Sequence, residues 1–163
     1  MGRALAHAHP QVEVVVFDLP QVQTEATTFL ADHSIGGHCR FEAGNFFKTI
    51  PAGGDIYLLK WVLHDWGDER CMRILQNCRA ALSPSGRVVI IERLIPDPLE
   101  PGHQSSAVLR FDMAMLALGG VGTAQERTLG QYDGLLDAVG FERQDVMPLT
   151  EGFVAITATR PSP

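Results

Sequence analysis

The sequence predicts an α/β fold built around a mainly parallel sheet. Apolar runs typical of strands buried on both faces occur at residues 12–19, 55–63 and 87–94. A helical pattern separates the second run from the third, and two more strand patterns follow each other at the end of the chain. Alternating strands and helices of this kind are the signature of an α/β domain.

Composition indicates one globular domain over residues 1–163. The chain is 45% hydrophobic and 20% charged, which is enough apolar material to bury a core. Its formal net charge is -6, and its Lys and Arg residues do not cluster, so we expect no nucleic-acid or anionic-membrane partner and a small ligand instead. No apolar stretch has the length of a membrane span, and no secretion signal opens the sequence, so we expect a cytoplasmic protein.

The elements can be justified in order. The first strand ends at Asp18, directly before Leu19 and a proline. After the second strand, Asp65 and Asp68 have the spacing of an N-cap residue and a third-position acid, which predicts a helix start at Asp65. Apolar side chains then recur at helical spacing, and Pro84 with the nearby glycine ends the helix. The apolar positions are Cys71, Ile74, Leu75, Cys78 and Leu82.

The last third of the chain predicts two helices and a hairpin. In the helix expected at 106–118, Asp112 and Met115 share one stripe that can face a ligand. Thr128 and Gln131 form a capping-box pattern, and Gly140 stands where a left-handed helix end belongs. Residues 141–149 and 152–159 read as consecutive antiparallel strands.

Six motifs resemble those of the plant caffeate-type and bacterial natural-product O-methyltransferases, which depend on S-adenosylmethionine. They are LKWVLHDWGDERCMRIL at 59–75, VVFDLPQV at 15–22, GNFF at 44–47, IIERLIP at 90–96, FDMAML at 111–116 and QERT at 125–128. The resemblance covers nearly the whole chain. It implies a Rossmann-like class I methyltransferase sheet, parallel except for one reversed strand near the carboxyl terminus, with the cofactor at the carboxyl ends of the strands.

Family members carry further parts ahead of this region, namely a dimerisation domain, the first sheet strand and a glycine-rich loop. None of these is recognisable in residues 1–163, so we expect a catalytic portion that lacks the first strand and the loop. The family homodimer is expected without its usual interface. In the family topology the first strand lies between the strands ending at Asp18 and near Lys60. Its absence is expected to leave two apolar edges unpaired or to force them together, with weak cofactor binding as the result.

The resemblance also implies a set of cofactor-binding residues. Asp18, with Leu19 beside it, would accept hydrogen bonds from the ribose hydroxyls, although a turn-forming Asp before Leu-Pro is the plain alternative. Asn45 stands where the family usually has an acid that contacts the adenine, and an ordinary Gly-Asn turn explains it equally well. Three more residues would complete the pocket. They are Phe46 at the adenine, Lys60 at the amino-acid end and Trp61 as a wall, with a surface lysine and a core tryptophan as alternatives.

The predicted catalytic residues are His64, Glu92 and Glu126. A neutral imidazole can remove the proton of the acceptor hydroxyl during in-line methyl transfer, and one of the two acids would fix its tautomer. Glu92 has the stronger case, because an acid in an apolar strand needs a partner or a function. Asp65 is assigned to the helix cap and not to this set. A satisfied core histidine is the competing interpretation of His64.

The predicted acceptor is a small hydroxylated aromatic molecule facing Asp112 and Met115. The spacing of His33, His38 and Cys39 lacks a fourth ligand, so we expect metal-independent transfer. Two other functions remain open at this point. One is a non-catalytic remnant or partner subunit, and the other is an NAD-dependent dehydrogenase domain, which would need phosphate-binding glycines that are missing here.

Overall fold

The computed structural model describes residues 1–31, 38–98, 110, 112–113 and 124–161. The chain divides into two compact units, Met1–Pro51 and Ala52–Pro163, and each is described by itself. The expectation that residues 1–163 form a single catalytic domain stays a prediction. Within the described residues, no helix is both long and apolar enough to cross a membrane.

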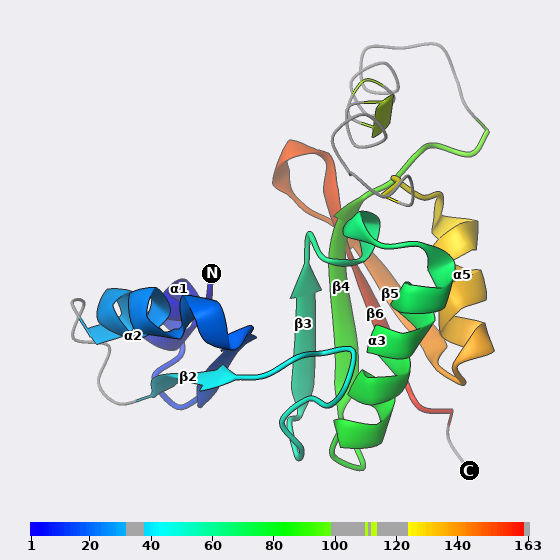
Figure 1. Cartoon of the computed structure of the whole chain (residues 1–163). Coiled ribbons are helices and arrows are strands. Elements are labelled where there is room, and N and C mark those ends of the chain that lie inside the picture. The colour runs from blue at the N-terminus through cyan, green and yellow to red at the C-terminus, as the bar shows by residue number, and fades with distance from the viewer. Residues whose placement is uncertain (32–37, 99–109, 111, 114–123, 162–163) are drawn as a thin grey trace. The chain divides into compact units, whose positions relative to one another are not determined.

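The first unit is a small parallel α/β element (Figure 1). It contains α1 (Gly2–Ala8), β1 (Val14–Asp18), α2 (Gln23–Ala31) and β2 (Cys39–Ala43). β1 pairs with β2 in parallel, with Val16 opposite Phe41. β1 is the predicted first strand, whereas α2 and β2 were not predicted. The pattern of β2 is hard to recognise, because its Arg40 is charged and pairs with Glu13 and Glu42 at the surface.

The second unit is built on a four-stranded mixed sheet with the order β3-β4-β6-β5. β3 (Ile56–Lys60) and β4 (Arg87–Arg93) are parallel, and β6 (Phe153–Thr159) runs antiparallel to both β4 and β5 (Glu142–Pro148). The predicted closing hairpin is therefore confirmed, and the α/β class with one reversed strand is as expected. β1 and β3 belong to separate sheets.

Two helices of the second unit lie beside each other against this sheet, α3 (Asp68–Ala81) and α5 (Leu129–Ala138) (Figure 1). The predicted apolar stripe of α3 is buried, including both cysteines, which are free thiols. The fully buried side chains of Ile90 and Ile156 lie opposite each other on β4 and β6. These contacts place the core between the helices and the middle of the sheet.

The helix ends of the second unit agree with the sequence in one case and not in the other. Thr128 and Gln131 form the predicted reciprocal capping box of α5, and Gly140 has the predicted positive φ of 76°. The predicted start of α3 is wrong, because the N-cap residue is Gly67 and the cap makes no side-chain hydrogen bond. Asp65 lies instead in a separate short 3-10 helix, Leu63–Asp65. Asp65 therefore belongs to the 3-10 turn between β3 and α3 and not to the N-terminus of α3.

Candidate active site

The segment that follows β3 presents His64. The backbone turns sharply at Trp61, which has a positive φ of 54°, and then forms the 3-10 helix Leu63–Asp65. A positive φ is uncommon for a bulky residue and costs conformational energy of about 1–3 kcal/mol, which the surrounding contacts must supply. His64 is buried, with 4% of its surface exposed. The sheet thus ends in a strained turn that places an imidazole out of solvent.

Three carboxylates surround the imidazole of His64. Its Nδ1 lies 3.2 Å from Glu126 Oε1 and 3.9 Å from Glu92 Oε2, and its Nε2 lies 3.5 Å from Asp65 Oδ1. Both glutamates lie beside this histidine, as predicted from the sequence. The sequence analysis favoured Glu92, but Glu126 is the nearer of the two. The assignment of Asp65 to the helix cap is wrong, since its carboxylate faces the ring edge. The tight 3-10 turn makes this contact between adjacent residues possible.

Glu92 reaches the site through the alternation of β4. Val88, Ile90 and Glu92 occupy every second position and are each fully buried, so the acid is on the face that packs against the helices. Its Oε1 accepts hydrogen bonds from the backbone N–H groups of Val62 and Leu63, at 3.1 and 3.0 Å. Glu92 therefore fixes the backbone ahead of His64 as well as facing its ring.

Glu126 comes from a short extended segment that precedes α5. Its neighbour Arg127 forms an isolated parallel bridge with Leu94, just beyond β4. Glu126 is buried, and its backbone N–H donates to Asp112 Oδ1 at 2.8 Å. Asp112, predicted to face the acceptor, thus binds the backbone of Glu126, one of the two predicted catalytic acids. Met115, predicted for the same stripe, lies outside the described residues.

The electrostatics of the site favour a proton on the cluster. Burial opposes the charged imidazolium, but the hydrogen bond that the ring donates to Glu126 and the charges of Glu92 and Asp65 outweigh it, so the pKa of His64 is raised. Burial raises the pKa of Glu92 from 4.5 to about 7, against the opposing effects of His64 and of two backbone N–H groups. A carboxylate only accepts hydrogen bonds, so a ring proton on Nδ1 would satisfy the contact with Glu126.

These shifts predict that the chain becomes less stable as pH rises. A raised pKa means that the folded state binds more protons than the unfolded state between the two values, and the stability from those protons is lost through that window. For Glu92 the window runs from 4.5 to about 7, and for His64 it begins at 6.5. We expect a lower urea midpoint at about pH 8 than at about pH 5.

The matched variant is Glu92→Gln, which cannot ionise. We expect it to flatten the pH dependence of the urea midpoint. The corresponding change in the free energy of unfolding is at most about 3 kcal/mol, since one pKa unit is worth about 1.4 kcal/mol. Glu142→Gln, an exposed glutamate on β5, serves as the control and keeps the wild-type slope. An unchanged slope in Glu92→Gln would mean that this acid does not hold a proton in the folded chain.

Two buried residues that the sequence analysis did not assign to the site, Arg127 and Cys71, also hold the turn. Arg127 donates to the carbonyl oxygens of Leu63 and Trp66, at 3.0 and 2.7 Å. Burial raises the pKa of Cys71 to about 11, so its thiol keeps the proton that it donates to the same two carbonyls. Arg127 is part of the QERT motif, and an arginine directly after a predicted catalytic acid was the available signal.

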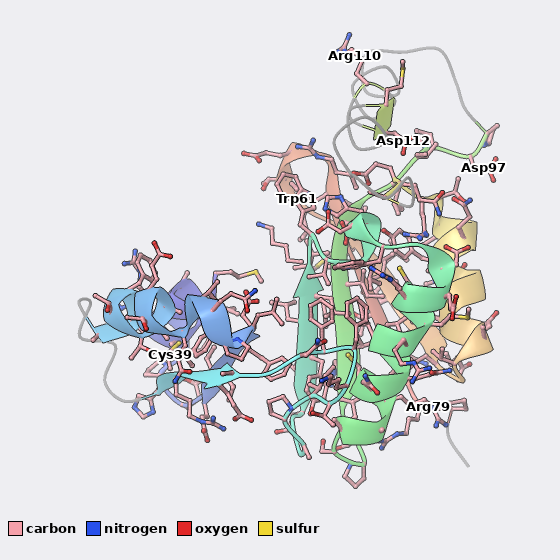
Figure 2. The ribbon with its side chains drawn as sticks, in the orientation of Figure 1. Cys39, Trp61, Arg79, Asp97, Arg110 and Asp112 are labelled. Atoms are coloured by element: carbon pink, nitrogen blue, oxygen red, sulfur yellow. The ribbon has the colours of Figure 1, made fainter. Side chains whose placement is uncertain are left out.

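An aromatic cluster lies against the imidazole of His64. The indole of Trp61 stacks on the His64 ring, with centroids 5.7 Å apart and an interplanar angle of 18°, and it also contacts Phe153. Lys60 and Arg93 place their cationic groups over the Phe153 ring, at 5.4 and 4.9 Å from its centroid. Trp61 is 42% exposed and is labelled beyond the end of β3 in Figure 2. Lys60 and Trp61 thus lie at the site, and their cofactor roles stay predictions.

The predicted ribose and adenine residues meet at one edge of the first unit. Asp18 ends β1 opposite the last residue of β2, and the backbone N–H of Gly44 donates to its carbonyl oxygen. The Asp18 carboxylate is exposed and accepts from the N–H of Leu19 at 2.7 Å. Asn45 Oδ1 accepts from the Phe47 N–H at 2.8 Å, which is the turn interaction offered as its alternative role. Gly44 has no room for a side chain, because a Cβ would collide with the Phe17 ring.

Phe46 completes this edge, half-buried and in edge-to-face contact with Phe47 at a centroid distance of 4.7 Å. The structure therefore brings Asp18, Asn45 and Phe46 together at the carboxyl ends of β1 and β2, where nucleotide folds bind their ligands. Among the described residues, no group of three or more His, Cys, Asp or Glu side chains could hold a metal ion. His33, considered above as a ligand, lies outside them.

Comparisons with known proteins agree with the motifs. The profile of the O-methyltransferase domain family matches residues 1–142. The phenazine O-methyltransferase of Lysobacter antibioticus is 37% identical over 158 residues, covering 97% of this chain and 44% of that protein. The 3-amino-4-hydroxybenzoate 4-O-methyltransferase of Streptomyces cremeus is 38% identical over 153 residues, covering 93% and 40%. The chain spans less than half the length of these relatives.

Solved structures give the same result. The S-adenosylhomocysteine-bound form of CalO1, a methyltransferase in calicheamicin biosynthesis, superposes with a TM-score of 0.85 at 29% identity, covering 98% of this chain and 45% of that one. The predicted Rossmann-like methyltransferase class is confirmed, and so is S-adenosylmethionine as the cofactor of the family. A dehydrogenase domain is not supported. With the family profile matching 142 of its 163 residues, the chain belongs to the O-methyltransferase domain family.

Proposed function

We propose that this chain forms the catalytic portion of an enzyme that transfers a methyl group from S-adenosylmethionine to a hydroxyl of a small aromatic molecule, with His64 as the general base. The observation that carries the proposal is the 3.2 Å contact between His64 Nδ1 and Glu126 Oε1 in a buried site. An imidazole held in this way has its second nitrogen in the basic form, as in other base-orienter pairs.

The chemistry requires few groups from the protein. Bound S-adenosylmethionine supplies an electrophilic methyl on a sulfonium sulfur. As the acceptor oxygen forms its bond to the methyl carbon, the bond between that carbon and the sulfonium sulfur would break and S-adenosylhomocysteine would leave, while the hydroxyl proton passes to His64 Nε2. The imidazolium so formed is stabilised by Glu126, Glu92 and Asp65, whose oxygens lie 3.2 to 3.9 Å from the ring nitrogens. The upward shift in the pKa of His64 matches this task, because it strengthens the base.

Several residues would hold the cofactor. The exposed carboxylate of Asp18 can accept from two ribose hydroxyls, and Phe46 offers an aromatic face for the adenine. The Oδ1 atom of Asn45 already accepts the turn hydrogen bond from the Phe47 N–H, so its amide nitrogen is the group that would contact the adenine. Lys60 Nζ and the indole of Trp61 would meet the amino-acid end, with Leu19 beside the ribose.

The acceptor class is inferred from the site and from the named relatives. Both relatives act on aromatic compounds by name, a phenazine and an aminohydroxybenzoate. The exposed indole of Trp61, which stacks on the His64 ring, offers a flat aromatic face on which a planar acceptor could lie. Asp112 is the described residue that would face it, and Met115 stays a prediction. A cytoplasmic location and a homodimer are likewise proposals.

The decisive experiment measures methyl transfer by the protein that carries this chain. S-adenosylmethionine with a labelled methyl group is incubated with a panel of hydroxylated aromatics, and label transfer to the acceptor oxygen is followed by mass spectrometry. Transfer that depends on His64 supports the proposal. Binding of the cofactor without transfer to any acceptor would favour the alternative of a non-catalytic partner subunit.

Cofactor binding gives a separate prediction. We expect Asp18→Ala to raise the dissociation constant of S-adenosylhomocysteine at least about tenfold, because hydrogen bonds to charged groups contribute about 1.5–3 kcal/mol each. Glu25→Gln, an exposed acid on α2, is the control and leaves the affinity unchanged. Calorimetric titration measures both. Equal affinities for wild type and Asp18→Ala would remove Asp18 from the cofactor site.

A further inference from the structure

The turn that carries His64 is held at almost every backbone polar group. Glu92 accepts from the N–H groups before the ring, and the carbonyl of His64 itself accepts from the Gln125 N–H at 2.9 Å. The remaining carbonyls on either side, those of Leu63 and Trp66, both receive hydrogen bonds from Arg127. A 3-10 turn next to a residue of positive φ needs such contacts, because its own geometry is unfavourable.

Arg127 is itself positioned with unusual completeness. It is fully buried, and its Nε and Nη2 both donate to Asp68 Oδ1, at 3.1 and 2.8 Å. Asp68 is the first residue of α3, so the guanidinium joins the turn to the start of that helix. Its planar fork of donors reaches two carbonyls and a carboxylate at once, which a lysine cannot do. The charge is balanced by Asp68.

Neighbouring residues of one extended segment thus act on the same histidine from two sides. Gln125 bonds the backbone of His64 through its N–H, Glu126 bonds the ring, and Arg127 bonds the flanking carbonyls. In an extended chain, successive side chains point in opposite directions, so this division follows from the local geometry. Any shift of this segment would move Glu126 and Arg127 together.

We infer that Arg127 is a positioning residue for the proposed base, fixing the 63–66 turn so that the His64 ring stays against Glu126. The inference rests on the proposed function for its catalytic meaning, but its geometric content is independent of it. Arg127 does not contact the reacting atoms. Its loss is expected to loosen the ring from its acid partners and not merely to lower stability.

The test compares Arg127→Met and Arg127→Lys with Arg79→Met. Arg79, labelled in Figure 2, also donates from Nε to a backbone carbonyl, that of Gly140 at 3.1 Å, but on a distant part of α3. The main readout is the NMR titration of the His64 ring, which needs no catalytic activity. The charged groups that face this ring are Glu92 on β4, Glu126 on the extended segment and Asp65 on its own turn.

We expect the His64 titration to move down toward its ordinary value in both Arg127 variants and to stay in place in Arg79→Met. In the active protein, kcat falls by about 10²-fold in the Arg127 variants with little change in the KM for the cofactor. The reason is that a small displacement of the His64 imidazole takes it out of position for the acceptor hydroxyl. An unchanged His64 titration in a folded Arg127 variant overturns the inference. If Arg127→Met does not fold, the titration of the milder Asp68→Asn variant decides in the same way.

The two proposals fail separately. If His64→Ala retains full transfer, the proposed function falls, while the titrations still decide whether Arg127 positions the ring. If methyl transfer depends on His64 but the His64 titration is unchanged in the Arg127 variants, only the positioning role of Arg127 is lost.

Discussion

Replacing His64 by alanine is expected to lower kcat for methyl transfer by about 10²–10⁴-fold, the usual contribution of a positioned general base. The physical reason is that the substitution removes the group that would accept the hydroxyl proton in the proposed mechanism. In the proposed mechanism, His64 Nε2 is the nitrogen that accepts the proton, and Nδ1 lies against Glu126 Oε1. Affinity for S-adenosylhomocysteine should be unchanged, because the predicted ribose residues belong to the other unit of the chain.

The experiment needs a second variant, because removing a buried imidazole leaves Glu92 and Glu126 without their partner. His64→Gln offers an amide that can donate to Glu126 but cannot act as a base. His9→Ala, an exposed histidine near the amino end, controls for the loss of a histidine as such. We expect His64→Gln to be as inactive as His64→Ala. Near-normal turnover in either one would show that another group removes the proton.

The largest effect on stability is expected for Ile156→Ala, which should lower the free energy of unfolding by about 2–5 kcal/mol. Ile156 is fully buried in β6 and lies opposite the fully buried Ile90 of β4, in the middle of the four-stranded sheet. Close packing leaves little room for neighbours to collapse into the cavity, so the lost contacts are not replaced. Urea denaturation followed by tryptophan fluorescence measures the change.

Ile56→Ala is the matched control, because it makes the same substitution at an edge strand. Ile56 opens β3 and is 59% exposed, so its loss should cost less than about 1 kcal/mol. The contrast between two isoleucines tests the burial pattern directly. Similar losses at both positions would contradict the placement of β6 in the interior and of β3 at the edge.

Predictions from sequence succeeded where a local pattern carries the information. The capping box of Thr128 and Gln131 and the left-handed Gly140 depend on residues within a few positions of each other, and both are present. The apolar run of β4 and the two strand patterns of β5 and β6 were recognisable for the same reason. The β2 strand was missed because its charged Arg40 obscures an apolar pattern of only five residues.

The sequence by itself determined the α/β class, the family motifs and the candidates His64, Glu92 and Glu126. Only the tertiary structure decided that Glu126 is the nearer acid, that Asp65 faces the ring and that Arg127 holds the turn. The contacts of Glu126 and Arg127 join residues more than 60 positions apart. That of Asp65 depends on the 3-10 turn, and neither this turn nor the rotation of a buried ring is encoded in a short-range pattern.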